Sequence, residues 1–169
     1  MKRHLLILAC AVPWVAFGAY AADSPDASFY KHAAEAGLAE VSDATLAQQS
    51  ATDPKLKDFA AMMIKDHSAA NDKLSALAGT KNITLPTSAS VGEMATHEKL
   101  KLESGTTFDN SYIKGQISAH RATLRLLRKE IASGQDQDAK DFAKSVLPTV
   151  QAHLKAINTI ATADGVSTK

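Results

Sequence analysis

The sequence contains one cysteine and one tryptophan, and both lie close to its start, as Cys10 and Trp14. The 148 residues that follow residue 21 contain neither. A domain without cysteine has no disulfide, no thiolate ligand and no nucleophilic thiol. Its stability must therefore come from packing, and any metal ion that it binds must be held by nitrogen or oxygen atoms.

The chain also lacks an excess of charge of either sign. Residues 22–169 carry 17 lysines and arginines against 18 aspartates and glutamates. A nearly neutral domain has no overall electrostatic attraction to nucleic acid or to an anionic membrane surface. We therefore expect no nucleic-acid partner.

A long apolar run is missing as well. The opening segment has a basic start at Lys2 and Arg3, about thirteen apolar residues from Leu5 to Phe17, and the small-x-small ending Ala19-Tyr20-Ala21. A membrane span needs about 20 apolar residues, so a retained anchor is disfavoured, as is lipoprotein processing at Cys10. We predict a signal peptide over residues 1–21 and no transmembrane anchor after cleavage. The predicted destination is the periplasm, with association to the outer membrane as a further option.

The rest of the sequence predicts helices. No segment alternates with the period of a strand, and strong helix formers dominate. Asp53-Pro54 is a typical helix start, and two pairs, Ser90 with Glu93 and Thr106 with Asp109, have the spacing of a capping box. These signals predict five helices at about 28–50, 54–78, 91–103, 107–133 and 137–163.

The lengths of the connections predict the architecture. Short loops join the first two and the last two long helices, so each pair forms an antiparallel hairpin. A long crossover that carries the short helix joins the two hairpins. An up-down bundle has three short loops, whereas a ferritin-like four-helix bundle has a long crossover. We therefore predict that residues 22–169 form a single all-α, ferritin-like domain.

One polar residue interrupts the apolar stripe of each long helix. The four interruptions are Glu40, His67, His120 and His153. Each lies within about one turn, roughly 5 Å, of the middle of its helix, so in a packed bundle the four should meet at one level.

Buried polar groups must find partners. An unpaired one costs about 2 to 7 kcal/mol, a large part of the stability of a domain. Three imidazoles and one carboxylate suit a single ion of zinc, iron, copper or nickel. The alternative is a hydrogen-bonded network of Glu40 and the histidines that fixes helix register without metal. Asp66, next to His67, points about 100° away around the helix, so we expect it to face solvent or a neighbouring interaction.

Four segments together resemble one known family. They are AAEAGLAEV, LKDFAAMMIKDHSAANDKLSALA, TFDNSYIKGQISAH and KDFAKSVLPTVQAHL. In this order they resemble the bacterial domain-of-unknown-function family 4142, over about Phe29 to Ile160. The resemblance implies a ferritin-like helical fold in exported proteins without an established activity. The polar positions that it implies are Glu40, Asp66, His67, Asp109, Tyr112, His120 and His153, of which Asp66, Asp109 and Tyr112 would support the other four.

The sequence departs from the di-iron proteins of the ferritin-like class. Those proteins use a Glu-x-x-His motif on two helices, but here Ile64, Ile117 and Val150 stand three residues before the histidines. With one interior carboxylate, a di-iron centre and iron storage are disfavoured.

These observations lead to three functional hypotheses. We favour an exported helical protein of unestablished activity that binds a single transition metal ion, and we name no catalytic residue. The second hypothesis is a non-enzymatic envelope or stress-related module that contacts an envelope protein and has a structural His–Glu network. The third is a metal-dependent oxidoreductase.

Overall fold

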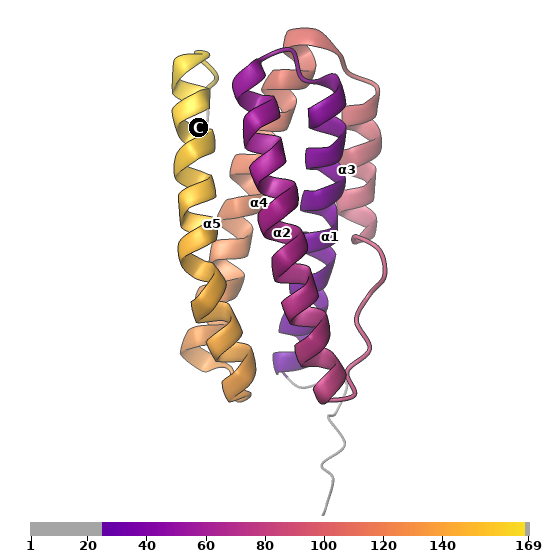
Figure 1. Ribbon diagram of the computed structural model, residues 1–169, viewed down its shortest axis with the longest axis vertical. Helices are drawn as coiled ribbons and strands as arrows, with labels where there is room; N and C mark the ends of the chain where they lie inside the picture. The colour runs from indigo at the N-terminus through magenta and orange to yellow at the C-terminus, as the bar shows by residue number, and fades with distance from the viewer. Residues whose placement is uncertain (1–24, 168–169) are drawn as a thin grey trace, which may run out of the picture.

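A computed structural model describes residues 25–167, and this part of the chain forms five helices and no strand. The helices are α1 (Pro25–Ser50), α2 (Pro54–Thr80), α3 (Val91–Lys101), α4 (Gly105–Ser133) and α5 (Gln137–Ala163) (Figure 1). The prediction of an all-α fold is confirmed. The predicted signal peptide lies outside the described residues.

Local signals set two of the helix starts as the sequence predicts. The Asp53 side chain accepts a hydrogen bond of 2.9 Å from the backbone N of Lys55, and Pro54 occupies the first helical position of α2. At α3 the capping box is present, because the Ser90 hydroxyl accepts from the backbone of Glu93 while the Glu93 carboxylate accepts from the backbone of Ser90.

The predicted capping box of Thr106 and Asp109 is wrong. Helix α4 starts earlier, at Gly105, and its N-cap Ser104 makes no side-chain hydrogen bond. The buried carboxylate of Asp109 instead accepts from the backbone N of Thr52, at 3.0 Å, and of Asp53, at 3.1 Å. Amides near a helix start lack intrahelical acceptors, so this carboxylate satisfies them and fastens the α1–α2 loop to α4.

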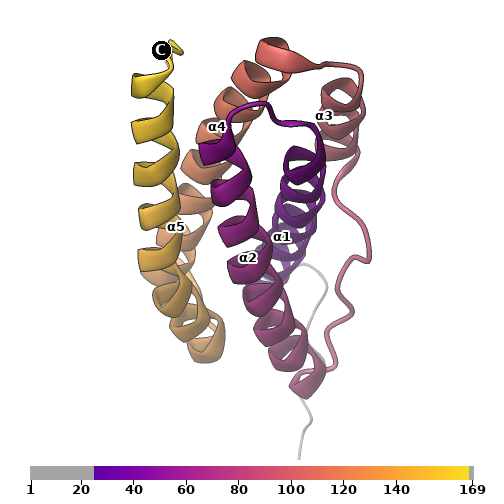
Figure 2. The ribbon, with the colours of Figure 1, turned by 45° about the horizontal axis from the view of Figure 1, so that its top comes forward.

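The four long helices form a bundle with the order α1, α2, α5, α4 around its axis. The α1–α2 and α4–α5 hairpins pack closely, whereas α1 meets α4 and α2 meets α5 over smaller areas. The long connection returns the chain to the other end of the bundle, so α2 and α4 run in the same direction (Figure 1). Helix α3 lies outside the bundle, beside α1 (Figure 2). The bundle is confirmed, and its ferritin-like character remains a prediction.

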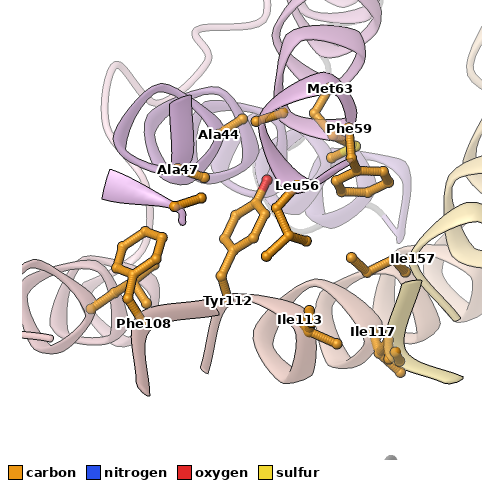
Figure 3. Close-up of a cluster of buried hydrophobic side chains, with 14 residues drawn as sticks. Ala44, Ala47, Leu56, Phe59, Met63, Phe108, Tyr112, Ile113, Ile117 and Ile157 are labelled. Atoms are coloured by element: carbon orange, nitrogen blue, oxygen red, sulfur yellow. The ribbon is translucent and has the colours of Figure 1, made fainter. Parts of the chain in front are cut away.

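Two apolar clusters fill the bundle, and the predicted polar positions lie between them. One cluster contains Met63, Ile117 and Ile157, together with the aromatic and aliphatic side chains of Figure 3. The other contains Leu74, Leu124 and Val150. On α2, α4 and α5, one histidine stands between a member of the first cluster and a member of the second. The core therefore has a polar layer in its middle. None of the described helices combines the length and the apolarity needed to cross a membrane.

Candidate metal centre

The three histidines of the polar layer point toward one another from α2, α4 and α5. Their ring centroids are 5.4 Å (His67–His153), 5.6 Å (His120–His153) and 5.8 Å (His67–His120) apart. One potential ligand atom from each ring lies within 4.8 Å of those of the other two. The residues are 8% (His67), 1% (His120) and 2% (His153) exposed. Within residues 25–167 this is the one group of three or more His, Cys, Asp or Glu side chains close enough to hold a metal ion.

Two of the rings are oriented by hydrogen bonds on their outer nitrogens. Nδ1 of His120 lies 2.8 Å from the backbone oxygen of Gln116, and Nε2 of His153 lies 3.0 Å from Oδ2 of Asp66. A carbonyl or carboxylate oxygen only accepts, so in both rings the outer nitrogen carries the hydrogen. In each neutral ring the other nitrogen therefore keeps its lone pair. Such an outer partner is typical of histidines that bind metal ions.

The inner nitrogens have no partner. Nε2 of His67, Nε2 of His120 and Nδ1 of His153 are all buried, and none makes a hydrogen bond. Buried polar atoms in folded proteins are nearly always paired, so three unpaired nitrogens in one layer require an explanation. The lone pairs of His120 and His153, together with the neighbouring ring of His67, form a ligand set for one metal ion.

Burial keeps the imidazoles of His67 and His120 neutral. Burial, with a smaller contribution from the neighbouring His120 and His153, lowers the pKa of His67 to about 3. Burial also lowers the pKa of His120 to about 4, against the raising effect of its bond to the Gln116 carbonyl. At neutral pH both rings are therefore uncharged, which is the form that binds metal.

Glu40 belongs to the same layer but lies behind His120. Its Oε2 accepts a hydrogen bond of 2.7 Å from the Gln116 amide, and its Oε1 is 3.5 Å from Nδ1 of His120. Nδ1 is the outer nitrogen of that ring, so Glu40 stands on the opposite side from the unpaired Nε2. Burial raises the pKa of the Glu40 carboxyl to about 8. The structure thus brings the three histidines together and places the predicted fourth ligand outside their group.

Asp66 makes a neighbouring interaction, which is one of the two outcomes expected for it. Its side chain is one-third exposed, yet its carboxylate reaches His153 on the neighbouring helix. The 100° angle from His67 turns Asp66 toward α5 rather than away from the bundle.

Asp109 contacts the α1–α2 loop, and Tyr112 belongs to the first apolar cluster. The carboxylate of Asp109 accepts hydrogen bonds from Thr52 and Asp53. The Tyr112 ring stacks on Phe108, with centroids 6.2 Å apart, and meets Phe59 edge-on (Figure 3). Its hydroxyl is buried without a hydrogen-bond partner. Neither residue makes a described hydrogen bond to a histidine of the layer.

The sequence interpretation missed Gln116. Its backbone oxygen orients His120 and its side-chain amide holds Glu40, so one residue joins both groups. The signal was available, because Gln116 stands three residues after Ile113 and four before His120, on the inward face of α4.

Two hollows reach the polar layer from opposite faces of the bundle. A cleft of about 160 Å³ between α2 and α5 is lined by His67, His153 and Asp66 among others. A groove of about 630 Å³ against α1, α3 and α4 is lined by Glu40 but by none of the three histidines.

Comparison with known proteins shows the fold and the family. The crystal structure of a DUF305 protein from Streptomyces coelicolor, described as a candidate secreted protein, is similar to this chain with a TM-score of 0.73 at 15% identity. The similarity covers 88% of this chain and 99% of that one, and at this identity it shows the fold alone. No curated protein matches the sequence. The family model of a domain of unknown function, DUF4142, matches residues 16–160, and the chain therefore belongs to the DUF4142 family.

Proposed function

We propose that this protein binds a single transition metal ion, of zinc, iron, copper or nickel, through His67, His120 and His153. The observation that carries the proposal is the set of three buried, unpaired and convergent ring nitrogens. All three donors are imidazole nitrogens, the ligand type that suits these four metals.

The three ligand atoms must move slightly closer together when a metal ion binds. Metal–nitrogen bonds of about 2.0–2.1 Å place two ligand atoms about 3.3 Å apart in a tetrahedron. The ligand atoms lie within 4.8 Å of one another, so each pair approaches by at most about 1.5 Å. Small rotations of the three histidine side chains are enough for this approach.

A metal-free network explains the site less well. In such a network the inner nitrogens need donors, but the rings of His120 and His153 direct their N–H groups outward. Each buried acceptor without a partner costs about 1 to 3 kcal/mol. A metal ion satisfies all three nitrogens at once.

We propose further that the protein acts after export to the periplasm. The predicted signal peptide supports export, and so does the candidate secreted protein that shares the fold. We propose a binding role rather than catalysis, because the unpaired ring nitrogens that carry the proposal are ligand atoms.

Calorimetric titration of the metal-free protein tests the metal proposal. We expect one Zn²⁺ per chain and a higher melting temperature, because an ion that binds the folded state stabilises it. His67→Ala should lose this binding, and His32→Ala, at an exposed position on α1, should keep it. Titrations with copper, nickel and iron identify the preferred metal. No binding of any of the four would overturn the proposal.

A further inference from the structure

The α2–α5 cleft gives the three-histidine site a side that opens to solvent. His67 and His153 line this cleft, whereas the nearly inaccessible His120 does not. On the far side of His120 stand Gln116 and Glu40. An ion between the three rings is therefore enclosed toward α1 and approachable from the face that α2 and α5 form (Figure 1).

Three histidine ligands leave one coordination position of a four-coordinate metal ion vacant. Three protein ligands with a vacant fourth position are typical of zinc sites that accept an exogenous molecule, whereas closed structural sites use four protein ligands. Glu40 does not supply the fourth ligand, because it faces the outer nitrogen of His120. The vacant position then faces the cleft.

The residues that line the α2–α5 cleft indicate what kind of molecule could occupy the vacant position. Lys73 supplies a positive charge, and Ser145 and Thr149 supply hydroxyl groups. Asp66 adds a carboxylate, but this group already accepts a hydrogen bond from His153. The volume of about 160 Å³ is well below the roughly 300 Å³ at which pockets for drug-sized ligands begin.

We infer that this cleft admits a small inorganic anion to the vacant position of the metal, with the ammonium group of Lys73 on the anion's outer side. The inference rests on the proposed metal site. It adds an anion-binding function to that site.

The larger groove on the opposite face does not suit this role. Glu35, Asp43 and Glu93 line it together with Glu40, and it contains no lysine or arginine. Its lining would repel an anion, and none of the three histidines reaches it.

Azide titration of the cobalt-loaded protein tests the inference. The protein is loaded with Co²⁺, whose visible absorption reports its ligands, and cobalt content is measured before azide is added. We expect a saturable change in the cobalt bands with one azide per ion. Lys73→Met should raise the dissociation constant for azide about fivefold, the size expected for one exposed charge. Lys65→Met, an exposed lysine of α2 outside the cleft, is the matched control and should leave it unchanged.

A second pair of variants identifies the route of entry. Ala70→Leu fills the α2–α5 cleft and should weaken azide binding at least tenfold, whereas Ala122→Leu fills the opposite groove and should not. A protein that binds no cobalt would overturn the metal site and this inference together. Three results would overturn the anion inference and leave the metal site standing. They are a cobalt spectrum that does not change with azide, equal effects of the two lysine variants on azide binding, and a loss of azide binding in Ala122→Leu but not in Ala70→Leu.

Discussion

Nε2 of His153 on α5 lies 3.0 Å from Oδ2 of Asp66 on α2, so one hydrogen bond crosses the interface between the two hairpins at the level of the proposed metal site. The bond orients the ring and leaves its Nδ1 unpaired toward the other histidines. It links the packing of the hairpins to the geometry of the ligands.

Removal of this carboxylate should weaken metal binding. We expect Asp66→Ala to raise the dissociation constant for Zn²⁺ about 10- to 100-fold, the usual effect of losing a partner behind a metal-binding histidine. Asp66→Asn keeps an acceptor oxygen and should lose less. Asp72→Ala, at an exposed position on the same helix, is the control. Equal affinities for Asp66→Ala and wild type would contradict the assigned role.

The Gln116–Glu40 pair should behave as a coupled unit. Gln116→Leu leaves the buried Glu40 carboxyl without its 2.7 Å hydrogen bond, so we expect a loss of about 1 to 3 kcal/mol in the free energy of unfolding. The double variant Gln116→Leu/Glu40→Leu removes both polar groups and should recover most of that loss. Denaturant unfolding of the two single variants and the double variant measures the coupling, and strictly additive losses would contradict it.

The metal-free protein should be most stable at mildly acidic pH. The folded-state pKa values of His67 and His120, about 3 and 4, lie below the ordinary 6.5. The unfolded chain thus binds more protons below pH 6.5, and the free energy of unfolding falls as the pH drops from there toward 4. The pKa of Glu40 is raised from 4.5 to about 8, so the folded state binds more protons between these values and stability falls as the pH rises toward 8.

Denaturant unfolding at a series of pH values measures this profile. Glu40→Gln should weaken the decline above pH 6.5 and retain the decline on the acid side. Part of the decline should remain, because burial also raises the pKa of Glu130 to about 7. A profile that is flat from pH 4 to 8 in the wild type would show that these groups do not titrate as the structure indicates.

Tyr112 should act as a core residue. Its hydroxyl is buried without a partner, so Tyr112→Phe removes an unsatisfied group while the ring keeps its contacts with Phe108 and Phe59. We expect the melting temperature to stay equal or rise, and the affinity for Zn²⁺ to stay unchanged. A tenfold loss of affinity in Tyr112→Phe would instead make the hydroxyl a support of the metal site.

Much of the fold follows from local signals in the sequence. Asp53-Pro54 and the Ser90–Glu93 pair start helices because their side chains act on the backbone within three residues. The inward faces of His67, His120 and His153 follow from helical periodicity, because each interrupts an apolar stripe, and the structure buries all three.

Periodicity does not say which helix lies opposite a given face. The bond of Asp66 to His153 can be predicted only if α5 is known to lie beside α2. In the same way, the bond between Gln116 and Glu40 can be predicted only if α1 is known to lie beside α4. Asp109 had a plausible local role with Thr106, but the free amides of a loop that is distant in sequence provide its partners. Tertiary contacts decided these positions.

The metal content of protein purified from the periplasm without chelators tests the central claim most directly. Elemental analysis should find close to one equivalent of zinc, iron, copper or nickel per chain in the wild type, a greatly reduced amount in His120→Ala, and an unchanged amount in His32→Ala. Wild-type protein that carries none of these metals and gains no melting temperature when each is added would contradict the account.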